Sequence, residues 1–187
     1  MTDPVPPSAS GFRFLGERQI HQGHVIRVVQ GEYGTPDGEV MHRDVVRHPG
    51  AVGVVPVDGD DIVLVRQYRA PAHEELLEIP AGKRDVVGEA PEITAIRELE
   101  EEVGFTADAV VPLARFYNSV GFSDEFSHVF LATELRPVPL QRQGPEELHM
   151  TIERVALDDA ADWVADGRIR DAKTVIGVLA ALRHLGR

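Results

Sequence analysis

A run of glutamates inside a helix-forming segment, RELEEEVGF at residues 97–105, most constrains how this chain can fold. Pro91 suits the first turn of a helix, and Gly104 suits the position just beyond the last turn, where a left-handed backbone is common. Together these residues predict a helix from about residue 91 to residue 103. The acids crowd its C-terminal half, where the helix dipole is already negative, so the run requires an explanation.

The predicted helix has two chemically different faces. At about 100° per residue, Glu98, Glu101 and Glu102 share one face. The opposite face carries apolar residues that we expect in the core: Ile93, Ile96, Leu99 and Val103. The glutamates repel one another, and Mg²⁺ or Mn²⁺ would relieve that repulsion because hard cations bind carboxylate oxygens. Taken alone, the run is explained equally well by a solvated acidic face.

The expected elements come in the order strands, helix, strands, helices, and this order around a mostly hydrophobic sheet predicts the α/β class with helices on both faces. The turn TPDG at residues 35–38 separates two alternating segments and predicts a β-hairpin. We expect a tight turn at Ala81 and Gly82 and a polar loop at about 136–148. Strands are expected near 24–33, 39–46, 51–57, 61–69, 75–79, 109–117, 126–133 and 149–155, and further helices near 158–166 and 171–185.

Charge and composition narrow the function. The net charge of -12, from 31 acidic and 19 basic residues, argues against a nucleic-acid partner because phosphate backbones are bound by Lys and Arg. The absence of cysteine excludes disulfides and thiolate metal sites. The first eleven residues, with three prolines and neither a basic region nor an apolar run, predict a disordered tail. No apolar stretch is long enough to span a bilayer, so we expect no membrane partner and a cytoplasmic protein.

The glutamate run belongs to a longer pattern. Seven residues separate Glu89 from Arg97, and the segment then reads RELEEEVGF. This resembles the Nudix box, whose second half is Glu, seven residues, and Arg-Glu-apolar-any-Glu-Glu-any-Gly-apolar. Six residues separate Gly82 from Glu89 where the box has five, so that loop carries one extra residue, which Gly88 would supply. The resemblance implies a Nudix-type α/β/α sandwich with a mixed sheet.

The resemblance also implies roles for individual residues. The metal ligands would be Ala81, through its carbonyl, and Glu98, Glu101 and Glu102. Structural support of the box would come from Gly82, Glu89, Arg97 and Gly104. The catalytic set would contain Glu147, expected to activate water from a loop before a late strand, with Glu146 as the next candidate and Glu102 beside them. A solvated loop acid is the alternative for Glu146 and Glu147.

Segments outside the box resemble the ADP-ribose pyrophosphatase branch of Nudix hydrolases. They are VRQYR at 65–69, LEIPAG at 77–82, GFSDE at 121–125, and C-terminal stretches at 163–169 and 171–174. This branch implies Mg²⁺-dependent hydrolysis of ADP-ribose to AMP and ribose 5-phosphate, with Arg69 and Glu125 as candidate substrate contacts. The alternative for Arg69 is a surface salt bridge, and the alternatives for Glu125 are a contact with a partner subunit or a plain polar loop position. Val120 stands where the branch usually has proline, and valine does not fix φ as proline does, so the substrate-facing loop can differ in shape.

Two alternatives stay open. One is a Nudix hydrolase of another small nucleotide, such as a nucleotide sugar or a dinucleoside polyphosphate. The other is a non-catalytic domain that only senses nucleotides, since fold resemblance does not prove activity. The resemblance further predicts three parts of the chain: a tail at 1–11, an N-terminal β region at 12–47 that builds a homodimer, and a catalytic domain at 48–187.

Overall fold

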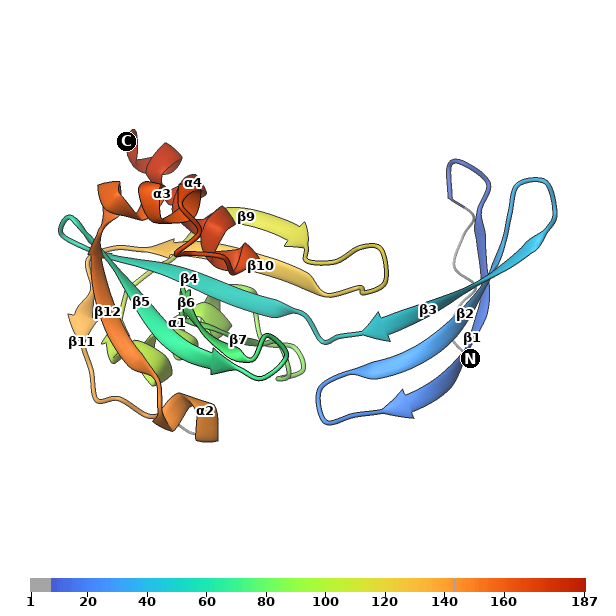
Figure 1. The fold of residues 1–187 in the computed structure, drawn as a ribbon, viewed down its shortest axis with the longest axis horizontal. Coiled ribbons are helices and arrows are strands. Elements are labelled where there is room, and N and C mark those ends of the chain that lie inside the picture. Colours follow the sequence, from blue (N-terminus) through green and yellow to red (C-terminus); the bar gives the residue numbers. More distant parts are fainter. Residues whose placement is uncertain (1–7, 143) are drawn as a thin grey trace. The chain divides into compact units, whose positions relative to one another are not determined.

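The computed structural model describes residues 8–142 and 144–187, and the chain divides into two compact units. The first unit contains the chain up to Pro49 together with Tyr117–Phe126, and the second contains Gly50–Phe116 and Ser127–Arg187 (Figure 1). Among the described residues, no helix is both long and apolar enough to cross a membrane.

The elements follow the expected order closely. The strands are β1 (Arg13–Gln22), β2 (Arg27–Gly34), β3 (Val40–Arg47), β4 (Ala51–Asp58), β5 (Asp61–Arg69), β6 (Glu74–Glu78), β7 (Ala81–Lys83), β8 (Phe105–Thr106), β9 (Val111–Tyr117), β10 (Phe126–Ala132), β11 (Arg136–Pro137) and β12 (Thr151–Ala156). The helices are α1 (Pro91–Val103), α2 (Pro145–Leu148), α3 (Leu157–Ala165) and α4 (Ala172–Leu185). Every expected strand and helix has a counterpart, and its ends move by only a few residues.

The first unit contains an antiparallel sheet in the order β1-β2-β3. Strands β2 and β3 form the predicted hairpin, with Arg27 opposite Arg47 and Gly34 opposite Val40. Strand β1 lies within the predicted β region, but the sequence does not predict it as a separate strand. Register shifts near Gly16 and His21 interrupt its alternation of polar and apolar residues.

The sheet of the second unit is mixed, as predicted. Its main strands run in the order β12-β5-β4-β10-β9, with β6 beside β5 and β7 beside β4. Strand β10 is parallel to β4, whereas β5, β6, β7 and β12 pair with their neighbours antiparallel.

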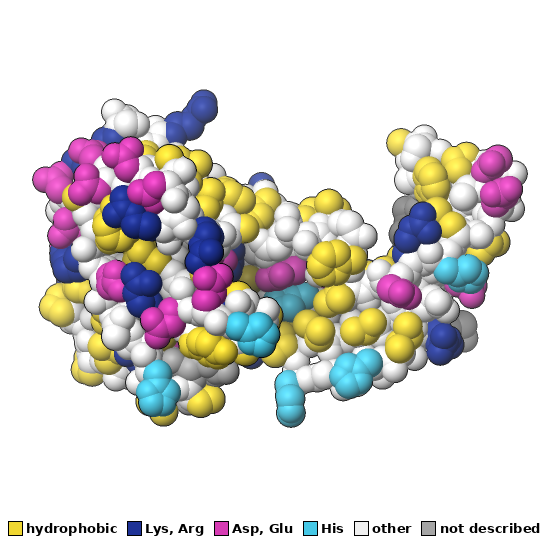
Figure 2. Space-filling view, viewed as in Figure 1, with side chains coloured by type: hydrophobic (Ala, Val, Ile, Leu, Met, Phe, Trp, Pro, Cys, Tyr) yellow, Lys and Arg dark blue, Asp and Glu magenta, His cyan; other side chains and the backbone are white. Residues whose placement is uncertain are grey.

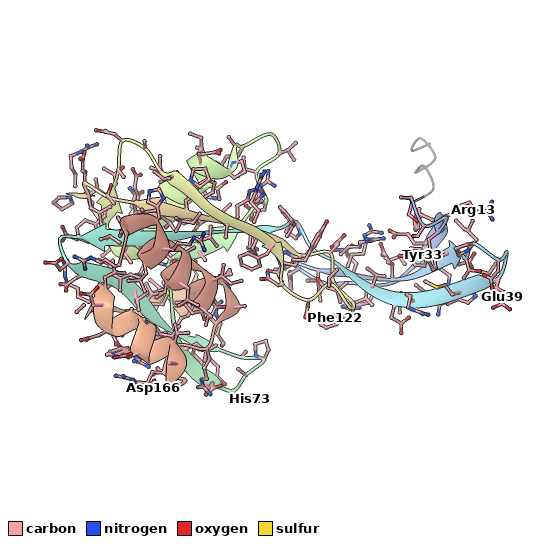
Figure 3. The ribbon with its side chains drawn as sticks, turned by 90° about the horizontal axis from the view of Figure 1, so that it is seen from above. Arg13, Tyr33, Glu39, His73, Phe122 and Asp166 are labelled. Carbon is pink, nitrogen blue, oxygen red and sulfur yellow. The ribbon has the colours of Figure 1, made fainter. Side chains whose placement is uncertain are left out.

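Side chains of the central strands alternate between two cores, because successive residues of a strand point to opposite faces. Val52 and Val54 of β4 pack in the core that α1 covers, whereas Val55 and Val57 pack in the core that α3 and α4 cover. A Cβ atom on Gly177 would lie 2.9 Å from a methyl carbon of Val55, so glycine allows α4 to approach the sheet. Figure 3 shows α3 and α4 side by side on one face. The predicted α/β/α sandwich is confirmed.

Helix α1 has the predicted bounds, but its buried face differs from the expected one. The side chain of Ile93 is 55% exposed, although the sequence predicts it in the core. Glu98 and Glu102 are only 7% and 5% exposed, and they are buried on the helix together with Leu99 and Val103. A solvated acidic face is therefore wrong for these two carboxylates, because the helix turns them towards the protein.

Three local expectations also need correction or restriction. Ala81 and Gly82 do not form a tight turn but begin β7, which pairs antiparallel with β4. The expected polar loop at 136–148 contains the short strand β11 and the short helix α2. Of the predicted disordered tail, residues 1–7 lie outside the described residues, whereas Ser8 accepts a hydrogen bond from Gly11 in a turn.

Candidate active site

Two buried carboxylates of α1 form the centre of the site. Glu98 and Glu102 lie one helical turn apart, so their side chains project from the same face. The pKa of Glu98 is raised to about 7, chiefly by burial; Arg97 opposes this shift, and the charges of Glu101 and Glu147 add to it. Burial likewise raises the pKa of Glu102 to about 8, with contributions from Glu98 and Glu147. The ionised form of each carboxylate is therefore unfavourable unless a cation lies nearby.

Arg97 holds three of the surrounding carboxylates. Its Nη1 lies 2.8 Å from Oε1 of Glu98 and 3.1 Å from Oε2 of Glu101, and its Nη2 lies 3.5 Å from Oε2 of Glu89. Glu89 also accepts a 2.6 Å hydrogen bond from the hydroxyl of Thr94, which lowers the pKa of Glu89. The structure thus places Glu89 and Arg97 together beside the acidic face.

Strand β7 closes the site from the other side. The amide of Ala81 donates a 3.0 Å hydrogen bond to Oε2 of Glu102. A Cβ atom on Gly82 would collide with the carboxylate of Glu98, so only glycine fits there without movement. Gly88 in the longer loop and Gly104 after α1 both have positive φ, at 82° and 70°, a conformation that glycine adopts at no steric cost.

The residues present suit a divalent cation of the hard type. Among the described residues, no group of three acidic or histidine side chains already converges around a metal position. Arg97 contacts Glu98 and Glu101, while the Ala81 amide donates to Glu102. The donor set consists of carboxylate and carbonyl oxygens, two of them on the buried Glu98 and Glu102, and oxygen is the donor that Mg²⁺ and Mn²⁺ prefer. A metal ion would compete with Arg97 for Glu98 and Glu101.

Glu147 lies near the two buried carboxylates, on α2 instead of in an irregular loop. Its charge contributes to the raised pKa of both Glu98 and Glu102, which indicates proximity. Its Oε2 also accepts a 3.2 Å hydrogen bond from the amide of Gly144, as a third-position acid does at the start of a helix. The side chain of Glu146 lies outside the described residues.

Arg69 has a partner that the sequence does not predict. Its guanidinium donates two parallel 2.6 Å hydrogen bonds to Glu78, whose side chain is 1% exposed. The bond from Arg69 to Glu78 raises the pKa of Arg69, and Glu102 is close enough to contribute. The ion pair is therefore with a buried carboxylate beside the site, not with a surface acid.

The same carboxylate connects Arg69 to the start of α4. Lys173 lies 3.9 Å from Glu78 and 2.7 Å from Asp171. Asp171 caps α4 by accepting a hydrogen bond from the amide of Thr174, and the Thr174 hydroxyl accepts one from the amide of Ile79. Sequence reasoning misses this network. The one local signal for this network is an acid, Glu78, that lies between the apolar residues Leu77 and Ile79 just ahead of Pro80.

The two remaining positions, Val120 and Glu125, lie in Tyr117–Phe126, the second stretch of chain that belongs to the first unit. The side chain of Val120 is 76% exposed, and that of Phe122 in the same loop (Figure 3) is also exposed. Glu125 lies 4.0 Å from Nδ1 of His48. Arg47 anchors the loop to the sheet through Asp124, at 3.0 Å.

Comparisons with known proteins agree with this geometry. The NUDIX domain matches residues 47–175. The ADP-ribose pyrophosphatase of Bacillus subtilis is 41% identical over 165 residues, covering 88% of this chain and 89% of that protein. A methanol dehydrogenase activator of Bacillus methanolicus is 38% identical over 161 residues, covering 86% of each. A crystal structure described as an ADP compounds hydrolase has a TM-score of 0.81 at 23% identity, covering 94% of this chain and 96% of that one, and shows the same fold.

Proposed function

Because this chain belongs to the NUDIX family and is a Nudix hydrolase, we propose that it cleaves ADP-ribose to AMP and ribose 5-phosphate with Mg²⁺. The observation that carries this proposal is the pair of buried carboxylates, Glu98 and Glu102, held against β7. Similarity to the Bacillus subtilis ADP-ribose pyrophosphatase along most of the chain supports the choice of substrate.

Four residues would hold the metal: Ala81, through its carbonyl, and Glu98, Glu101 and Glu102. When bound, a divalent ion supplies positive charge that neutralises the diphosphate and activates water for attack. Glu98 and Glu102 suit this role because burial makes their ionised forms unfavourable without a cation. Arg97 pairs with Glu98 and with Glu89, and so offsets part of the negative charge on this face of the helix.

Glu147 is the residue that we propose as general base. Its charge acts on both buried carboxylates, which supports a role beside them. Its contact with Gly144 fixes the carboxylate in one orientation, which favours a directed proton transfer. Glu146 is the neighbouring candidate, and Glu102 completes the catalytic set as the carboxylate that faces Ala81.

Arg69 is the proposed contact for the substrate phosphates in the second unit. Its two bonds to Glu78 leave the remaining guanidinium donors available, and they hold the group in a fixed plane. Glu125, in the first unit, is the second proposed substrate contact.

Two observations favour an alternative to ADP-ribose hydrolysis. Val120 stands where the ADP-ribose branch usually has proline, and its side chain is 76% exposed. A relative that is 38% identical is named as an activator of another enzyme, methanol dehydrogenase. The alternatives are therefore another nucleotide substrate, such as a nucleotide sugar or dinucleoside polyphosphate, or a nucleotide sensor without turnover.

A substrate panel tests the proposal. We expect kcat/KM for ADP-ribose, measured with Mg²⁺ by release of AMP, to exceed that for nucleotide sugars, dinucleoside polyphosphates and nucleoside triphosphates. A higher value for one of those competitors would refute ADP-ribose as the substrate. Binding of ADP-ribose without release of any product would indicate the sensor instead.

We further propose that two copies associate through the first unit. Figure 2 shows hydrophobic side chains on the surface of this unit. Exposed large apolar residues there include Phe12, Leu15, Ile20, Val25, Val40, Tyr117 and Phe122. A closed two-fold pair would bury them, and such pairs are the commonest assembly of soluble proteins.

A further inference from the structure

The C-terminal end of α1 lacks a basic residue of its own in its last turn. The carbonyl of Glu102 lies in that turn, where the last four carbonyls of a helix have no partner within the helix. Arg142, forty residues further along the chain, supplies the missing donors. Its Nε donates to the Glu102 carbonyl at 3.2 Å, and its Nη2 donates to the same oxygen at 3.1 Å.

Arg142 also contacts Met150, eight residues further along the chain. Its Nη1 donates a 2.6 Å hydrogen bond to the carbonyl of Met150. The side chain of Met150 is buried in the core that contains Leu99 and Val103 of α1. One guanidinium therefore joins the end of α1 to both ends of the segment between residues 142 and 150.

This segment carries Glu147. The amide of Met150 donates to the carbonyl of Glu147 at 3.1 Å, and the amide of Leu148 donates to that of Gly144 at 3.0 Å. These bonds make α2 a compact turn whose exit, at Met150, is the point that Arg142 holds. The position of Glu147 relative to α1 consequently depends on Arg142 at the base of the turn.

We propose that Arg142 is a positioning residue, which fixes the Glu147 turn to the end of the helix that carries Glu98 and Glu102. The inference rests on the proposed role of Glu147 as general base. Arg142 is suited to the task because its planar group presents several donors in fixed directions, whereas lysine has a compact charge and a flexible stem. Charge-assisted bonds to carbonyls at a helix C-terminus also oppose the negative end of the dipole.

The chain offers a matched control in Arg136. It lies in β11 of the same connection and pairs with the exposed Asp108 at 2.6 Å. Arg136→Ala removes the same kind of side chain without changing the contacts of Arg142 with Glu102 and Met150, so it should retain the wild-type kcat.

The experiment compares Arg142→Ala, Arg142→Lys and Arg136→Ala in the full-length protein. We expect Arg142→Ala to lower kcat by about 10- to 10²-fold with KM changed less than about threefold, because small misplacements of a catalytic group are costly. Arg142→Lys should recover part of the loss. Amide hydrogen exchange over 144–150, measured without substrate or metal, should accelerate in Arg142→Ala and not in Arg136→Ala. Thermal melts identify a variant that fails to fold. If Arg142→Ala does not fold, Arg142→Lys is compared with Arg136→Ala in its place.

Combination with Glu147→Gln decides whether Arg142 acts through Glu147. In that background, Arg142→Ala should lower kcat by less than about twofold further, because the group it positions has already lost its function. An equal fold-loss in both backgrounds, or a kcat of Arg142→Ala equal to that of Arg136→Ala, would overturn the proposal. If Glu147→Gln alone keeps the wild-type kcat, the proposed base is wrong, and the exchange comparison still judges whether Arg142 holds the turn.

Discussion

The acids around α1 fall into groups according to what surrounds each side chain. Glu98 and Glu102 are buried and have raised pKa values, mainly because burial disfavours the charged form. Glu101 is partly exposed and pairs with Arg97. Glu147 instead comes from α2 and is held by a backbone amide. Substitutions that remove charge without changing size should therefore have separable effects.

Glu98→Gln and Glu102→Gln should each weaken Mg²⁺ binding and depress turnover together. Each change removes negative charge from the proposed ligand set, and metal affinity depends on that charge. Calorimetric titration with Mg²⁺ and the Mg²⁺-dependent rise in Tm report binding, and steady-state assays report turnover. Wild-type Mg²⁺ affinity in both variants would show that the metal binds elsewhere.

Glu147→Gln should leave Mg²⁺ binding unchanged and lower kcat by about 10²- to 10⁴-fold, as loss of a general base does. Glutamine can still accept the hydrogen bond from Gly144, so the turn should keep its shape. Glu146→Gln is the neighbouring comparison, assayed at saturating Mg²⁺. Wild-type kcat in both variants would show that neither residue is the base, and Glu101 would be the next candidate.

At the scale of the element, α1 shows which of its faces the protein buries. Ile93→Lys should change the free energy of unfolding by less than about 0.5 kcal/mol, since the side chain is exposed. Leu99→Ala should cost about 2–5 kcal/mol, because it opens a cavity in a core where Leu99 is fully buried. Urea unfolding measures both values. A large loss of unfolding free energy in Ile93→Lys would show that Ile93 is buried, as periodicity predicts.

The start of α4 provides an element with a pH dependence. Burial alone would raise the pKa of Asp171, but Lys173 and the bonds from Thr174 lower it below the usual 3.8. A depressed folded pKa adds stability that is present above pH about 4 and disappears as the pH falls through the folded value. Asp171→Ala should cost about 0.5–2 kcal/mol at pH 7 as a lost helix cap.

The difference between wild type and Asp171→Ala should shrink as the pH falls from 5 towards 3. Denaturant unfolding at several pH values measures that difference. A gap that widens on acidification would contradict the assigned sign, and Asp158→Ala in the exposed first turn of α3 serves as a control for a general loss of acidic charge.

At the scale of the whole molecule, the exposed apolar residues of the first unit predict association. Leu15→Glu in β1 should shift the protein towards the monomer at micromolar concentration, because a charge buried in the interface is costly. Val87→Glu, at a fully exposed position of the second unit, is the control. Light scattering during size-exclusion chromatography measures the mass. A wild-type protein that is monomeric and fully active would rule out the proposed pair.

Much of this molecule follows from the sequence alone because the signals are local. Pro91 and Gly104 bound α1 correctly, and the turn at 35–38 correctly predicts the hairpin of β2 and β3. The spacing from Glu89 to Phe105 identifies the family, which the NUDIX match confirms. Capping, turn geometry and motif spacing depend on residues close in the chain, so one sequence suffices to read them.

Tertiary structure alone decides how those pieces are used. Periodicity places Ile93 in the core, but packing against β7 buries Glu98 and Glu102 and leaves Ile93 exposed. The partners of Arg69 and Arg142 are likewise set by the fold, since Arg142 reaches a carbonyl forty residues earlier in the chain. Hydrogen-bond and charge partners distant in sequence leave no periodic trace. They exist only once the sheet brings β7, α1 and the turn before β12 together.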